Sequence, residues 1–111
     1  MVAKGWVPDA GDIIWLNFDP RAGHEQAGHR PAIVLSSAIY NGVTGMLLCV
    51  PMTTRVKGYS FEVRIAGDRG GVALADQVKS FDWRARRATR KGKASPAELD
   101  EIKAKLGTLI G

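Results

Sequence analysis

The feature that most limits the fold is a series of about six short apolar segments, bounded by glycine, proline or asparagine and followed by one helical segment. Residues 12–18 place Ile14, Leu16 and Phe18 on one side of a strand, and residues 60–65 alternate in the same way. Residues 46–50 are apolar at successive positions, as in a strand covered on both faces. This pattern predicts a small, strongly curved antiparallel sheet or barrel.

Further strands are expected at residues 32–36, 72–75 and 78–81. Pro51 is expected to mark a bulge or the end of the strand that precedes it. Residues 40–45 are predicted to form a turn, because Asn41-Gly42 is a typical hairpin signal.

The helix signal is clearest at the end of the chain. Ser95 is a typical N-cap, Pro96 takes the first helical position, and Glu98 completes a capping box. Apolar residues then follow at helical spacing: Leu99, Ile102, Leu106 and Leu109. One face of this helix is therefore expected to be buried.

The 111 residues predict one domain, spanning 1–111, with a core small enough that a partner subunit would add useful buried surface. The longest apolar run is far too short to cross a bilayer, and the first residues lack a stretch of signal-peptide length. A cytoplasmic protein without membrane contact is expected. Cys49 is the single cysteine and lies in an apolar run, which predicts a buried, unreactive thiol.

Positive charge is concentrated late in the chain. The formal net charge is +5, and seven cations against Asp82 give +6 between residues 79 and 93. Such a segment favours a polyanion or an acidic protein as partner, and the interleaved Phe81 and Trp83 could stack on bases. A solvated basic surface is the equally weighted alternative.

The loop at residues 19–31 carries the polar groups that catalysis uses most, between two apolar strands. In RNA the 2′-hydroxyl is a built-in nucleophile, so a protein need supply only a base, cationic stabilisation and a proton donor. Glu25 could accept the 2′-hydroxyl proton, Arg30 could neutralise the phosphorane oxygens, and Thr53 could donate a hydrogen bond to them. The products would be a 2′,3′-cyclic phosphate and a 5′-hydroxyl.

Other readings of this loop stay open. Arg30 could instead form a structural salt bridge to Glu25 or Asp19, and His24 with His29 could form the acid/base pair of a ribonuclease. The histidines and aspartates lack a recognisable metal-ligand spacing, and no Gly-Lys-Ser/Thr closes the loop as in a Walker sequence. Chemistry without a metal or another cofactor is therefore expected.

Several blocks of sequence stand out together over essentially the whole chain: Val7-Pro-Asp-Ala-Gly-Asp-Ile-Ile-Trp, Phe18-Asp-Pro, Gly23-His-Glu-Gln-Ala-Gly-His-Arg-Pro-Ala, Val50-Pro-Met-Thr-Thr, Lys57-Gly-Tyr-Ser-Phe-Glu-Val and Gly71-Val-Ala-Leu-Ala-Asp-Gln-Val-Lys-Ser. They resemble the MazF/PemK family of toxin endoribonucleases from toxin–antitoxin modules. The resemblance implies a CcdB/PemK-like fold, an SH3-like β-barrel with a C-terminal α-helix, assembled as a homodimer. It also implies sequence-specific cleavage of single-stranded mRNA without a metal.

The same resemblance implies roles for individual residues. It assigns catalysis to Arg30, Thr53 and Glu25. It assigns substrate binding to six positions: Asn17, Phe18, His29, Lys57, Gln77 and Lys79. Close relatives often carry aspartate where this chain has Asn17. The implied protein partner is a MazE-like antitoxin whose acidic tail competes with RNA, and the implied cleavage motif is an ACA-type triplet.

Two functions from other classes share this expected fold. A CcdB-like gyrase poison would act by binding through a tryptophan near its C-terminus, but this chain ends Lys-Leu-Gly-Thr-Leu-Ile-Gly. A noncatalytic nucleic-acid-binding module would need the basic segment without the pairing of Glu25 and Arg30.

Overall fold

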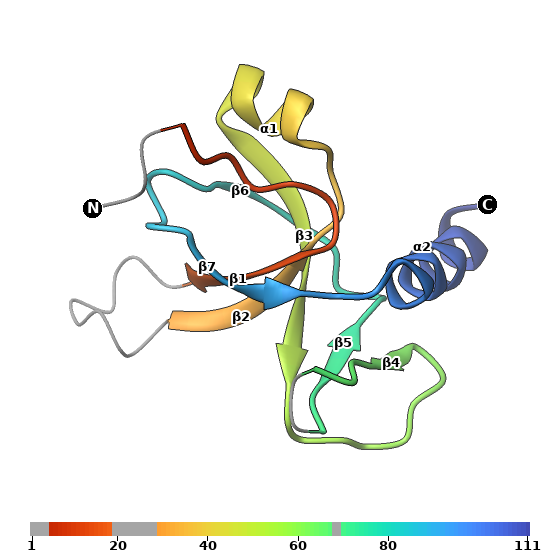
Figure 1. The fold of residues 1–111 in the computed structure, drawn as a ribbon. Coiled ribbons are helices and arrows are strands. Elements are labelled where there is room, and N and C mark those ends of the chain that lie inside the picture. The colour runs from red at the N-terminus through yellow and green to blue at the C-terminus, as the bar shows by residue number, and fades with distance from the viewer. Residues whose placement is uncertain (1–4, 19–28, 68–69) are drawn as a thin grey trace.

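The computed structural model describes residues 5–18, 29–67 and 70–111. These residues form seven strands and two helices: β1 (Asp12–Asn17), β2 (His29–Val34), α1 (Ala38–Thr44), β3 (Met46–Thr53), β4 (Glu62–Arg64), β5 (Val72–Leu74), β6 (Lys79–Asp82), β7 (Thr89–Lys93) and α2 (Pro96–Ile110). All strand pairs are antiparallel, in the order β4-β5-β3-β2-β1-β7, with β6 also paired to β3 (Figure 1).

The sheet is curved but not closed. β4 and β7 lie at the two ends of the path of paired strands, and in the described part of the chain no pairing joins them. The predicted mainly β fold with a C-terminal helix is confirmed, whereas the expected barrel is an open sheet. Within the part that is described, no helix is long and apolar enough to cross a membrane.

The central strands bury both of their faces, and this produces two cores. Ile13 of β1 packs with Ile33, Val50 and Val63, and Ile102 of α2 joins the same cluster. Ile14 and Leu16 of β1 point to the opposite face of the sheet, into a second cluster that includes Trp83. Because β3 contributes to both clusters, its run of apolar residues is explained.

β3 is longer than predicted and continues through Pro51 to Thr53. On one side, β3 pairs with β6 as far as Cys49 and then with β5 from Met52 onward. Pro51 lies in the interval between these two pairings, where its missing N–H costs no ladder bond on that side. The expectation that Pro51 ends the strand is therefore wrong.

The predicted hairpin turn at residues 40–45 is also wrong, because Asn41 and Gly42 lie within α1. Ser37 caps this helix, and Gly45 ends it with a φ of 74°. The Asn41 amide is fully buried and donates to the carbonyl oxygens of Pro8 (2.7 Å) and Ser36 (3.1 Å). These long-range bonds use the asparagine side chain that a tight turn would have exposed to solvent.

The strand prediction missed β7, whose sequence Thr-Arg-Lys-Gly-Lys has no apolar residue. It pairs with β1 along one side only, and the exposed cations are typical of an edge strand. The C-terminal helix is confirmed with its capping box at Ser95 and Glu98, and with Ile102 buried. Cys49 is buried as predicted, and burial raises the pKa of its thiol to about 12.

Candidate active site

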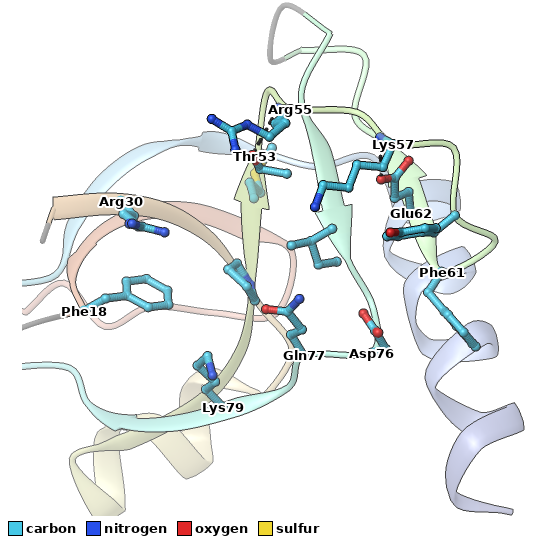
Figure 2. Close-up of a pocket in the computed structure, with 14 residues that line it drawn as sticks. Phe18, Arg30, Thr53, Arg55, Lys57, Phe61, Glu62, Asp76, Gln77 and Lys79 are labelled. Carbon is cyan, nitrogen blue, oxygen red and sulfur yellow. Dashed lines mark hydrogen bonds between the residues drawn. The ribbon is translucent and has the colours of Figure 1, made fainter.

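A cleft of about 290 Å³ opens where β2 begins and β3 ends, beside the loop that joins β3 to β4. Its lining includes six of the residues predicted for catalysis or binding: Phe18, Arg30, Thr53, Lys57, Gln77 and Lys79. In Figure 2, Arg30 and Phe18 lie on one side, Lys57 on the other, and Thr53 and Gln77 between them. Residues far apart in the sequence thus meet at one concave site.

Arg30 is held by strand pairing opposite Leu16, with its side chain exposed to the cleft. Among the described residues, no carboxylate forms an ion pair with it. Glu25 and Asp19, its predicted ion-pair partners, lie outside the described residues, as does His24. Arg30 therefore offers a guanidinium to an anion from a rigid backbone position.

Thr53 ends β3, where its backbone pairs with Val72. Its Oγ1 accepts a hydrogen bond of 3.1 Å from the backbone N–H of Arg55. A hydroxyl that accepts one bond keeps its own proton for donation. The arrangement suits Thr53 to donate to an anionic oxygen placed in the cleft.

The wall formed by Phe18 is fixed by a neighbouring arginine. The Arg86 guanidinium donates to the carbonyl oxygens of Asn17 (3.2 Å) and Phe18 (2.8 Å) and lies 4.5 Å from the Phe81 ring centre. Phe18 and Phe81 meet edge to face at 5.0 Å. These contacts hold an aromatic surface at the mouth of the cleft, where a base could stack.

Asn17 and His29 face each other across β1 and β2 and do not line this cleft. The His29 ring lies 5.6 Å from the Trp15 ring. An adjoining depression includes Trp15 and Lys91 and shares Arg30 and Thr53 with the main cleft. The main cleft and the adjoining depression therefore meet at Arg30 and Thr53.

Gln77 enters from the segment between β5 and β6, and Lys79 from the first position of β6. Gln77 N–H donates to the Leu74 carbonyl (3.0 Å), and Lys79 pairs with Cys49 across the sheet. Four further polar residues line the cleft that the sequence interpretation did not name: Arg55, Tyr59, Glu62 and Asp76. The alternation of residues 60–65 predicted that Glu62 points away from the core, but not that it faces the cleft.

Metal binding finds little support in the described part of the chain. No three His, Cys, Asp or Glu side chains gather there in an arrangement that could hold an ion. The cleft instead carries four cationic side chains, Arg30, Arg55, Lys57 and Lys79, against two carboxylates, Glu62 and Asp76. Its excess of positive charge suits a phosphate-bearing ligand.

The family described as the PemK-like, MazF-like toxins of type II toxin–antitoxin systems matches residues 9–110. The chain belongs to this family. The predicted membership is thereby confirmed.

Named relatives agree with the family match. The chain is 64% identical to the endoribonuclease toxin MazF of Escherichia coli over the full length of both proteins. It is 38% identical to the endoribonuclease toxin ChpB of Escherichia coli, with 92% of this chain and 93% of that protein covered.

Solved structures of MazF have the same fold. The crystal structure of MazF (Form-I) from Deinococcus radiodurans superposes with a TM-score of 0.84 at 55% identity, covering 96% of this chain and 98% of that one. A MazE–MazF complex from the same organism (Form-II) superposes with a TM-score of 0.83 at 49% identity, covering 96% and 97%.

Proposed function

We propose that this chain is a sequence-specific endoribonuclease that cleaves single-stranded mRNA without a metal, as the toxin of a toxin–antitoxin module. The observation that carries the proposal is the cleft that gathers the predicted catalytic residues Arg30 and Thr53 with four predicted substrate-binding residues: Phe18, Lys57, Gln77 and Lys79. A relative at 64% identity is an endoribonuclease toxin, which supports the reaction class. The chain would act as a single domain in the cytoplasm.

In the proposed reaction the 2′-oxygen attacks the adjacent phosphorus, and the bond from phosphorus to the 5′-oxygen breaks. Glu25 accepts the 2′-hydroxyl proton. Arg30 and Thr53 stabilise the charge that develops on the non-bridging oxygens, since donors fixed on strands need little reorganisation. The leaving 5′-oxygen takes up a proton from solvent, so the products are a 2′,3′-cyclic phosphate and a 5′-hydroxyl. The role of base is assigned to Glu25 and not to Arg30, because a guanidinium has hydrogen-bond donors and no acceptor.

The antitoxin of the Deinococcus complex is MazE, and a MazE-like partner is proposed for this chain as well. An acidic tail would be attracted by the cations that line the cleft and would exclude RNA from it. Inhibition would then be competitive with RNA.

The deciding experiment is cleavage of a defined single-stranded RNA that contains ACA, in the presence of EDTA, with mapping of both new ends. Cyclic-phosphate and 5′-hydroxyl ends are expected. Arg30→Ala is expected to lower the cleavage rate by about 10²-fold or more while the protein stays folded, because a fixed transition-state donor is lost. Cleavage only after magnesium is added, or full activity of Arg30→Ala, would refute the proposal.

A further inference from the structure

We propose that Glu62 is a positioning residue for RNA binding: its carboxylate fixes the loop between β3 and β4, which carries the cations Arg55 and Lys57 into the cleft. This inference rests on the proposed function for its RNA ligand, but the fixing of the loop is independent of it. Figure 2 shows Glu62 beside Lys57, on the wall opposite Arg30.

The loop itself contains little that would hold its shape. Residues 54–61 include no helix or strand, and residues 54–60 are all exposed. Within the loop, the Val56 N–H donates to the Thr54 carbonyl (3.1 Å), and Gly58 has a φ of 82°. Such a segment has low local stability unless it is tied to the sheet.

Glu62 supplies that tie with both carboxylate oxygens. Oε2 accepts the backbone N–H of Lys57 at 2.9 Å, and Oε1 accepts the backbone N–H of Gly58 at 2.9 Å. Two consecutive peptide groups are thus bound by one charged acceptor, and charge-assisted bonds are about twice as strong as neutral ones. The turn closes with Glu62 N–H donating to the Tyr59 carbonyl at 3.1 Å.

The backbone of Glu62 is anchored from the other side. Its carbonyl oxygen accepts a bond of 3.0 Å from Lys105 Nζ of α2, and Lys105 forms an ion pair of 3.1 Å with Glu101. Glu62 therefore links α2 to the side of the cleft that carries Arg55 and Lys57. Arg30 and the backbone of Thr53 are held by strand pairing and do not depend on this connection.

The negative charge of Glu62 affects RNA binding in the opposite direction to its positioning role. A carboxylate in a cleft that binds a polyanion repels the ligand, so removing its charge alone would tighten RNA binding. If positioning dominates, removing the carboxylate weakens binding. The direction of the change separates the two roles.

The test compares Glu62→Gln with Asp76→Asn, since both carboxylates line the same cleft. Loss of one ordered cationic contact costs about tenfold in affinity, so Glu62→Gln is expected to raise KM about tenfold with kcat within about twofold. Asp76→Asn is expected to lower KM, because it removes a carboxylate that repels RNA from the same cleft. Binding to a 2′-O-methyl RNA should weaken in parallel for Glu62→Gln, with a shallower salt dependence.

Limited trypsin digestion without RNA tests the loop directly. Cleavage after Arg55 and Lys57 is expected to be faster in Glu62→Gln than in the unsubstituted protein or Asp76→Asn. Gly58→Ala is a second variant that keeps the cleft charge: its Cβ meets nothing within 4 Å, but its φ of 82° is strained for alanine. It should raise KM as Glu62→Gln does.

The outcomes separate this inference from the proposed function. Glu62→Gln with unchanged or lower KM, or with unchanged trypsin cleavage, overturns the positioning role. If the unsubstituted protein neither binds nor cleaves RNA, the proposed function fails, while faster trypsin cleavage of Glu62→Gln still supports the fixing of the loop.

Discussion

At the scale of single residues, the cleft depends on side chains whose positions are set by backbone contacts. Thr53 is the clearest case, because strand pairing fixes its backbone and the Arg55 N–H fixes its hydroxyl oxygen. The hydroxyl proton is then the part left to act on a ligand. A role for Thr53 in charge stabilisation therefore predicts that its oxygen matters and its methyl group does not.

Thr53→Val is expected to lower the single-turnover cleavage rate by about 10²-fold, the loss found when one donor to a developing oxyanion is removed. Thr53→Ser keeps the hydroxyl and should retain most of the rate. The measurement is cleavage of a labelled RNA with enzyme in excess. Equal rates for the valine and serine variants would exclude the hydroxyl from the reaction.

The residue assignments that sequence could supply were those carried by motifs. The blocks of sequence that resemble the MazF/PemK family pointed to Arg30 and Thr53. Strand pairing explains why these distant blocks meet in the fold. Arg55, Tyr59 and Asp76 belong to exposed segments without periodicity. Only the folded course of two segments, between β3 and β4 and between β5 and β6, brings them to the cleft. Glu25 lies outside the described residues, so its role stays a prediction.

At the scale of elements, α2 is tied to the sheet through its first turn. The Glu98 carboxylate accepts the backbone N–H groups of Ala66 and Ser95, each at 2.8 Å, so it both caps the helix and holds the end of β4. The bond from Ala66, followed by that from Ser95, lowers the pKa of Glu98 below its ordinary value. A carboxylic acid whose pKa is lowered by folding stabilises the folded state only while it is ionised.

The stabilisation by Glu98 should therefore be fully present above its ordinary pKa and be lost as the pH falls through the lower folded value. At pH 7, Glu98→Gln is expected to reduce the free energy of unfolding by about 1 kcal/mol, as for loss of a helix cap. Thermal unfolding is measured from pH 7 to pH 3. The difference in melting temperature between the unsubstituted protein and Glu98→Gln should become smaller as the pH falls. Asp100→Asn, at an exposed position of the same helix, is the matched control. A difference between the unsubstituted protein and Glu98→Gln that stays constant with pH would contradict the role of the charge.

How far elements could be predicted depended on whether their signals were local. α2 has a complete local signature in Ser95, Pro96 and Glu98, and it was predicted correctly. α1 was mistaken for a hairpin turn because Asn41 makes its decisive bonds to Pro8 and Ser36, outside the helix. β7 has no apolar pattern, since pairing with β1 alone makes it a strand.

At the scale of the whole molecule, the basic segment 79–93 serves several purposes instead of forming one surface. Lys79 lines the main cleft and Lys91 the adjoining one. Others support the fold: Lys93 pairs with Asp12 at 3.5 Å, and Arg84 lies 4.4 Å from the Trp83 ring centre. Part of the charge thus contacts groups of the fold, and part lines the main cleft and the adjoining depression. Binding of a polyanion by this segment stays a prediction.

The expected homodimer needs an apolar surface that one chain leaves uncovered. The end of α2 offers one, with Leu109 47% and Ile110 77% exposed. Light scattering is expected to give twice the 12.0 kDa chain mass. Ile110→Asp should weaken the dimer about tenfold or more, because burying an unpaired charge costs more than the lost apolar contact. Ile39→Asp, at an 81% exposed position on α1, is the control that should leave the mass unchanged. If Ile39→Asp dissociates the dimer and Ile110→Asp does not, the interface lies at α1 instead.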